Sequence, residues 1–197
     1  MPFWSDNFAE EGGNLKDPKR QFRFKVEFTG ISAGGEGGLM WYAKSINKPS
    51  FTINSAEHKY LNHTFHYPGS VTWNTISMTL VDPRDPDMTA TLSDIIVLSG
   101  YTPPSNPNSL GSMSKSRAAG ALGYVYISQL DGDGNEIEKW TLWNAFISDI
   151  KYGDLAYGND DLVELTLELK YDWARLQSIG GPSKATGGDD QDSFFQS

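Results

Sequence analysis

The sequence predicts a mainly β protein with one flanking helix, and two observations favour this fold class. Apolar and polar residues alternate over several long segments, which is the period of a half-buried strand. Aromatic residues make up 13% of the 197 residues and 20 are glycine, and these favour strands and the turns between them. A single segment has the apolar spacing of a helix. A chain of this length suits one domain with a sizeable core.

The first half of the chain is expected to contain strands after an N-terminal arm over residues 1–20. The main domain spans residues 21–179, and its first strand is predicted where Phe22, Phe24, Val26 and Phe28 alternate with charged residues. A glycine-rich turn over 30–38 leads to a second strand over 39–45. Further segments are predicted as shorter extended pieces over 51–53 and 58–65, a turn over 67–70 and a strand over 71–81.

The helix is predicted to begin near Asp85, which can cap it, with Pro86 at the first helical position. The spacing of Met88, Leu92, Ile95 and Ile96 places these side chains on one helical face, and Gly100 suits the end. Residues 101–120 follow as an expected long loop, which in a compact domain is often functional.

The C-terminal half predicts a strong hairpin, with strands over 124–130 and 137–150 joined by a turn over 131–135. A second turn over 151–161 precedes a last strand over 162–171, where leucines alternate with glutamates. Residues 180–197 are rich in glycine and aspartate and cannot bury much surface. They are expected to form a flexible acidic tail.

Composition excludes several classes of function. The formal net charge of −9 argues against tight binding of DNA or RNA, which needs lysine and arginine to neutralise phosphates. The absence of cysteine excludes disulfides, thiolate metal sites and cysteine nucleophiles. No stretch has the length of apolar sequence that a membrane-spanning helix needs, and the N-terminus does not resemble a signal peptide.

No catalytic, metal-binding or cofactor-binding constellation is expected, so we do not predict an enzyme. Asp131, Asp133 and Asn135 have the alternate spacing of calcium ligands, but Glu136 and Leu142 stand where that motif needs glycine and glutamate. A plain hairpin turn is the better interpretation. The histidines at 58, 63 and 66 lack an acid or cysteine nearby that would complete a metal site.

Three stretches resemble one family. They are a strand with a following kink (22–28 and 43–49), a strand that leads into the helix (73–83), and the final strand pair (140–150 and 160–173). Their order and spacing are similar to those of the tail tube proteins of contractile-tailed bacteriophages. These proteins are related to the hexameric tube protein of type VI secretion systems.

The resemblance implies a β-barrel-like subunit made of two packed antiparallel sheets with one flanking α-helix. Hexameric rings would stack into a conduit for DNA inside a contractile sheath, in a virion assembled in the host cytoplasm. The sheath, baseplate and tail terminator proteins are the implied partners, and DNA would pass without specific binding. Two alternatives stay open: a tube-capping or baseplate tube protein of the same fold, and a β-sandwich carbohydrate-binding module.

Two sets of residues are candidates for roles in such a tube. Acidic strand residues expected to face the lumen are Glu27, Glu138, Glu164 and Glu168. Contacts between subunits or rings are expected from the arms and loops, with the candidates Phe3, Trp4, Phe8, Gly34, Gly35, Gly37, Gly38, Lys115 and Arg117. Loops at strand ends suit this role because the strands themselves are committed to pairing.

Overall fold

The computed structural model describes residues 19–30, 43–85, 87–104, 111–158 and 160–178. Most of the predicted N-terminal arm, the glycine-rich turn over 31–38 and the acidic tail lie outside the described residues. Within the described part, no helix is long and apolar enough to cross a membrane.

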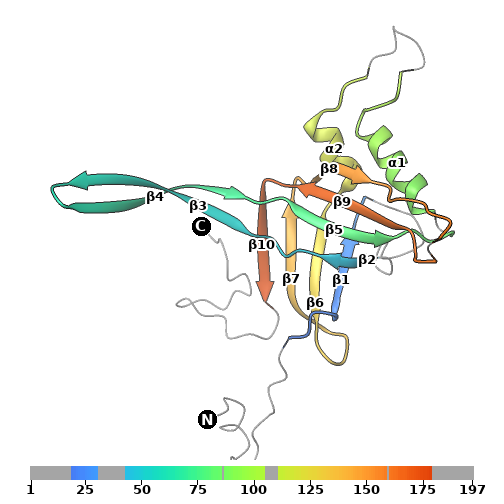
Figure 1. The fold of residues 1–197 in the computed structure, drawn as a ribbon, viewed down its shortest axis with the longest axis horizontal. Helices are drawn as coiled ribbons and strands as arrows, with labels where there is room; N and C mark the ends of the chain where they lie inside the picture. Colours follow the sequence, from blue (N-terminus) through green and yellow to red (C-terminus); the bar gives the residue numbers. More distant parts are fainter. Residues whose placement is uncertain (1–18, 31–42, 86, 105–110, 159, 179–197) are drawn as a thin grey trace, which may run out of the picture.

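Two four-stranded antiparallel sheets form the body of the molecule (Figure 1). Sheet A has the order β1 (Phe24–Phe28), β6 (Val125–Leu130), β7 (Glu136–Trp143) and β10 (Trp173–Ser178). Sheet B has the order β2 (Ala43–Ile46), β5 (Ile76–Val81), β9 (Glu164–Lys170) and β8 (Phe146–Lys151). The strands of sheet B run across the upper ends of those of sheet A, so that the lower part of sheet A extends beyond it.

The core lies between the two sheets and follows the alternation seen in the sequence. On β9, Leu165, Leu167 and Leu169 are buried, whereas Glu164 and Glu168, which alternate with them, point to the other face. Side chains of β1, β5, β6 and β7 complete the core in the same way, among them Val26, Ile76, Met78, Leu80, Val125 and Leu142. The predicted mainly β fold with two packed antiparallel sheets is confirmed, although strand pairing does not close the described sheets into a barrel.

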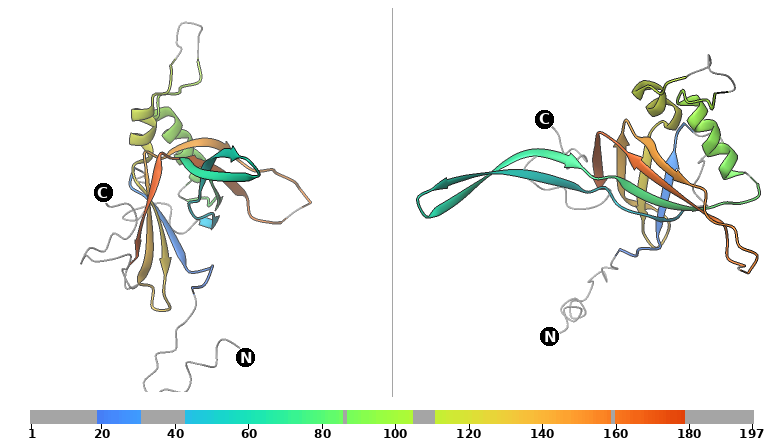
Figure 2. Two further views of the ribbon diagram at one scale, coloured as in Figure 1. Left: turned by 90° about the vertical axis from the view of Figure 1, so that its left-hand side faces the viewer. Right: turned by 45° about the horizontal axis from the view of Figure 1, so that its top comes forward.

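Two helices cover one end of the sheets, where one was predicted (Figure 2). Helix α1 (Met88–Leu98) is the predicted helix, but Asp87 caps it rather than Asp85, because the Asp87 carboxylate accepts a hydrogen bond from the Ala90 amide. Helix α2 (Lys115–Leu122) lies inside the segment predicted as a loop over 101–120. Ala118 and Leu122 are buried on its inner side, so tertiary packing stabilises a short helix that the sequence pattern did not indicate.

A long hairpin, β3 (Phe51–Tyr60) and β4 (His63–Trp73), projects from sheet B far beyond the body (Figure 1). Two short extended pieces and a turn were expected here, and the expected turn is wrong, because Pro68 and Gly69 lie within β4. Between Ile53 and Ser55 the pairing register shifts, so that Gly69 and Ser70 stand opposite Asn54 alone, which indicates a β-bulge in β4. The predicted strand over 71–81 is divided between β4 and β5 at Asn74 and Thr75.

The C-terminal strands also differ from the prediction in two places. The expected strand over 137–150 is divided into β7 and β8 at Asn144, whose φ of 54° turns the chain from sheet A to sheet B. The expected last strand, β9, is followed by a further strand, β10, which pairs with β7 and forms one edge of sheet A. Both differences arise because the chain crosses between the sheets at these points.

Candidate assembly surfaces

The face of sheet B that points away from the core is polar. It carries Ser77 opposite Glu168 and Thr79 opposite Thr166, on the paired strands β5 and β9. Strand β8 adds Asp149, which pairs in register with Glu168, and Lys151. We call these residues, together with Lys44 on β2 and Glu164 and Lys170 on β9, the polar face. Hydroxyl groups and mixed charges make it suitable for contact with water, because each polar group there stays hydrated.

Charge on the polar face is close to balanced. Lys44 forms an ion pair with Glu164, and this contact raises the pKa of the Lys44 ammonium group. Lys151 lies 3.7 Å from Asp149. With Lys170, which shares the outward face of β9 with Glu164 and Glu168, three lysines match the three carboxylates of Glu164, Glu168 and Asp149. The surface has no net charge and does not have the cluster of unbalanced cations that would hold phosphate groups.

The hairpin carries an exposed apolar surface. In its outer half, the register pairs Tyr60 with His63, His58 with Phe65 and Ala56 with Tyr67, so that these side chains share one face. Tyr60, Phe65 and Tyr67 are 63%, 49% and 56% exposed. The opposite face carries Lys59, Thr64, Glu57 and His66. We call the first side the aromatic face of the hairpin; among the described residues, none from the body covers it.

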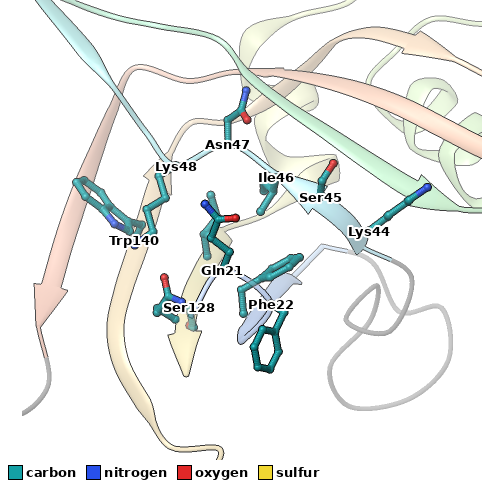
Figure 3. A pocket seen from close by; sticks show the side chains of 12 residues that line it. Gln21, Phe22, Lys44, Ser45, Ile46, Asn47, Lys48, Ser128 and Trp140 are labelled. Carbon is teal, nitrogen blue, oxygen red and sulfur yellow. The ribbon is translucent and has the colours of Figure 1, made fainter. Parts of the chain in front are cut away.

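The Glu138 side chain connects three separate segments of the chain. Its carboxylate accepts hydrogen bonds from Lys19, from Lys48 at 2.7 Å and from the Trp140 indole at 2.7 Å. Burial of this carboxylate by itself would raise its pKa, but the contacts with Lys19, Lys48 and Trp140 outweigh it and lower the pKa to about 2. Lys48 and Trp140 also line a groove between β2 and sheet A (Figure 3). Glu138 therefore fixes the chain on both sides of this groove.

We expect Glu138→Gln to lower the free energy of unfolding near neutral pH by about 2 kcal/mol, less than the full pKa shift implies because both lysines are half exposed. A lowered pKa gives stability that is fully present above about pH 4.5 and is lost as the pH falls towards 2. The difference between the variant and the native chain should therefore shrink on acidification. Urea unfolding at a series of pH values measures it, with Glu57→Gln on the exposed hairpin as the matched control.

A row of aromatic side chains crosses the face of sheet A that points away from the core. Tyr124, just before β6, contacts Trp143 on β7, which stacks on Trp173 on β10, with ring-centroid distances of 5.5 and 6.0 Å. We call these three residues the aromatic row. Tyr126 stacks against Tyr124, and the Lys139 ammonium lies 4.2 Å from the Tyr126 ring centroid. Tyr124 and Trp173 are each 46% exposed.

The described part of the loop between β8 and β9, residues 152–158 and 160–162, projects from the end of sheet B opposite the hairpin (Figures 1 and 2). Leu155, Tyr157 and Leu162 are 86%, 114% and 71% exposed. The loop also contains Asp154, Asp160 and Asp161 and has no lysine or arginine. It is therefore an apolar projection with acidic charge.

The structure separates the four acids expected in the lumen. Glu164 and Glu168 share the polar face, whereas Glu27 lies on the outward face of sheet A, opposite Tyr126. The Glu138 carboxylate is 10% exposed and is used in ion pairs, so it is not a free surface charge. Sequence periodicity could not distinguish these cases, because it gives the face of a strand but not which sheet the strand joins.

The candidate contact residues also fall in different places. Lys115 begins α2 and donates hydrogen bonds to both carboxylate oxygens of Asp172, at 2.8 and 2.7 Å, and this contact, with a further bond from Asn144, lowers the pKa of Asp172. Arg117 lies in α2 beside Gly100, which places it between the helices. The other candidates, Phe3, Trp4, Phe8 and the four glycines, lie outside the described residues, and their roles stay predictions.

The residues considered for metal binding form other arrangements. Asp131 accepts hydrogen bonds from the amides of Asp133 and Asn135, which closes the β6–β7 turn, and bonds from Asn135 lower its pKa. His58, His63 and His66 lie on the exposed hairpin. Within the described residues, no three histidine, aspartate or glutamate side chains gather as a metal site.

Comparisons with solved structures identify the fold. A subunit in the cryo-EM structure of the anti-feeding prophage baseplate matches with a TM-score of 0.58 and 17% identity, over 84% of this chain and 99% of that one. A subunit of the PVC sheath–tube complex in the extended state matches with a TM-score of 0.58 and 16% identity, over 84% and 95% of the two chains. The SPP1 tail tube matches with a TM-score of 0.52 and 13% identity, over 82% and 80%.

No protein-family model matches the sequence, and no curated protein matches it either. The resemblance that the sequence suggested is thus supported by three-dimensional structure. The chain has the fold of the tube proteins of contractile injection systems and phage tails.

Proposed function

We propose that this protein is a structural subunit of a tail tube, in which hexameric rings stack into a conduit inside a contractile sheath. The polar face lines the lumen in this proposal, and the outward face of sheet A and the helices lie away from it. The described fold supports this role, as does the similarity to a baseplate described as six-fold symmetrised. No enzymatic activity is part of the proposal.

The observation that carries the proposal is the exposed hairpin. Apart from Trp73, every residue of β3 and β4 is exposed, and the outer half carries three large aromatic side chains on one face. Isolated two-stranded hairpins are only marginally stable in water. A contiguous exposed apolar surface on such an arm marks a contact with another protein molecule. A second subunit that covers the aromatic face supplies the missing stabilisation.

The charge of the polar face suits passage of DNA without binding. A phosphate backbone binds where lysine and arginine displace its counterions. On the polar face, Lys44 and Lys151 each lie beside a carboxylate, and with Lys170 the lysines only balance the carboxylates. DNA that moves along such a wall meets no excess of positive charge and is not held. Sheath, baseplate and terminator proteins would contact the outside and the ends of this tube.

A place at the end of a tube is the second candidate, because the fold also matches a subunit in the anti-feeding prophage tube-terminating cap, with a TM-score of 0.54 over 91% of this chain. Electron microscopy of concentrated purified protein separates the candidates. A main tube subunit forms long tubes alone, whereas an end subunit stops at rings. A carbohydrate-binding module would stay monomeric, and that result would refute the tube proposal.

The orientation of the polar face can be tested by chemical labelling, because the chain has no cysteine of its own. In tubes of a Thr166→Cys variant, we expect a small maleimide to react at the polar face and a bulky polymer-linked maleimide to be excluded by the closed wall. Unassembled subunits should react with both reagents. A Gln177→Cys variant on sheet A is the comparison. Reaction of the Thr166→Cys tubes with the bulky reagent at the rate of free subunits would contradict a lumenal position.

A further inference from the structure

The aromatic row lies between two hollows of the surface. On one side, Val71, Trp73, Trp173, Ala174 and Arg175 line a groove of about 290 Å³ at the base of the hairpin. On the other side, a groove of about 350 Å³ lies between α2 and the row, lined by residues that include Gly120, Tyr124 and Trp143. Half-exposed tyrosine and tryptophan beside such hollows are typical of protein contact sites.

We propose that the aromatic row receives the β8–β9 loop, through residues 152–158 and 160–162, of a second copy of this chain. This inference rests on the proposed tube function and names one of its subunit contacts. The loop supplies Leu155 and Tyr157, which are almost fully exposed, and the row with its two grooves supplies the apolar surface that would cover them. Burial of these side chains is the driving force of the contact.

Charge selects this loop over the other exposed apolar projection of the described chain. Lys139 and Arg175 lie beside the row on the same face of sheet A. Of the acids near the row, Asp172 is already paired with Lys115, and Glu27 lies opposite Tyr126 on β1, at the far edge of the sheet from Trp173. The loop carries three aspartates and no cation, so it complements this surface, whereas on the outer hairpin Lys59 is balanced by Glu57. Complementary charge across an interface gives specificity, and only the loop offers it.

The positions of the two surfaces fit a repeating contact. The loop lies at the far end of sheet B from the hairpin, whereas the row crosses β6, β7 and β10 on the hairpin side, so one copy cannot fill its own row (Figures 1 and 2). Each copy therefore has one donor loop and one acceptor row. A contact of this head-to-tail kind produces closed rings or open stacks, and not isolated dimers.

Cross-linking in the cysteine-free background tests the contact. Ala156→Cys places a thiol in the loop without removing Leu155 or Tyr157, and Thr141→Cys places one on β7 beside the row. We expect the double variant, assembled and treated with a short bis-maleimide, to give a ladder of covalent oligomers beyond the dimer. Each single variant should give no ladder. Thr64→Cys combined with Thr141→Cys reports whether the hairpin occupies the row instead.

The outcomes separate this contact from the proposed function. Tubes or rings in the micrographs together with a ladder from the loop pair support both. Tubes or rings with a ladder only from the hairpin pair, or with no ladder, overturn the docking of the loop and leave the tube function standing, with the row covered by a different partner. Protein that never assembles, and never cross-links, overturns the tube function and the loop contact together.

Discussion

Replacement of Tyr60, Phe65 and Tyr67 by serine should abolish tube assembly while the subunit stays folded. The three side chains share the aromatic face of the hairpin, and none of them contributes to the core between the sheets. Their large exposed area contributes to stability only when a neighbouring subunit covers it, at about 25 cal/mol per Å² of apolar surface buried. Because each subunit repeats the contact, the loss of contact free energy is repeated at every subunit along the tube.

The measurements are electron microscopy and light scattering for assembly, and thermal unfolding for the isolated subunit. We expect an unchanged unfolding midpoint within a few degrees and no particles larger than the free subunit. The matched control replaces Lys59, Thr64 and His66 by serine, on the opposite face of the same strands. This control should assemble. Equal loss of assembly in both variants would show that the hairpin acts through its own folding and not through the aromatic face.

Much of the body was predictable from the sequence because its local patterns agree with the final packing. The leucines of β9 alternate with polar residues. The structure buries the leucines and leaves the polar residues on the opposite face, as expected for a half-buried strand. Helix α1 has its apolar residues at helical spacing, and Asp131 followed by glycine gives the β6–β7 turn. In these elements a single period or turn motif is sufficient, since tertiary contacts reinforce the local preference.

The hairpin could not be predicted in this way, because the alternation of apolar and polar residues indicates a strand only when one face is buried within the subunit. Both faces of β3 and β4 are exposed, and Pro68-Gly69 has the composition of a turn although it lies at a bulge. Helix α2 could not be predicted from the sequence for a different reason. It is short and contains serine and glycine, so its stability depends on burial of Ala118 and Leu122.

The candidate sites were predictable only in part, since function here depends on how surfaces from distant segments are combined. The acidic candidates were chosen by alternation, which correctly placed Glu164 and Glu168 on an outward face but also selected Glu138, a buried ion-pair acceptor. The aromatic row joins positions 124, 143 and 173, which become neighbours only through the order of strands in sheet A. No local pattern in the sequence contains that order.

Gly123→Ala should destabilise the subunit by at least about 3 kcal/mol, because two unfavourable effects coincide at this residue. Gly123 joins α2 to β6 with φ 69° and ψ −151°, a conformation open almost only to glycine. A methyl group there would also lie 2.5 Å from the Gly30 backbone nitrogen and 2.4 Å from the Thr29 hydroxyl. The expected result is a large fall in the urea midpoint with an unchanged slope, since the native fold is strained and not rearranged.

Two other glycines separate strain from steric overlap. Gly134 has φ 87° in the β6–β7 turn, and a methyl group there would have no atom within 4 Å, so Gly134→Ala should cost only about 1 kcal/mol of backbone strain. Gly120 lies within α2 and is equally open, so Gly120→Ala should stabilise the helix by up to about 1 kcal/mol. If Gly123→Ala cost no more than Gly134→Ala, the chain after β1 would be free to move away from the α2–β6 junction. The close approach of Thr29 and Gly30 would then not hold this corner of the subunit rigid, and the position of α2 beside the aromatic row would not depend on it.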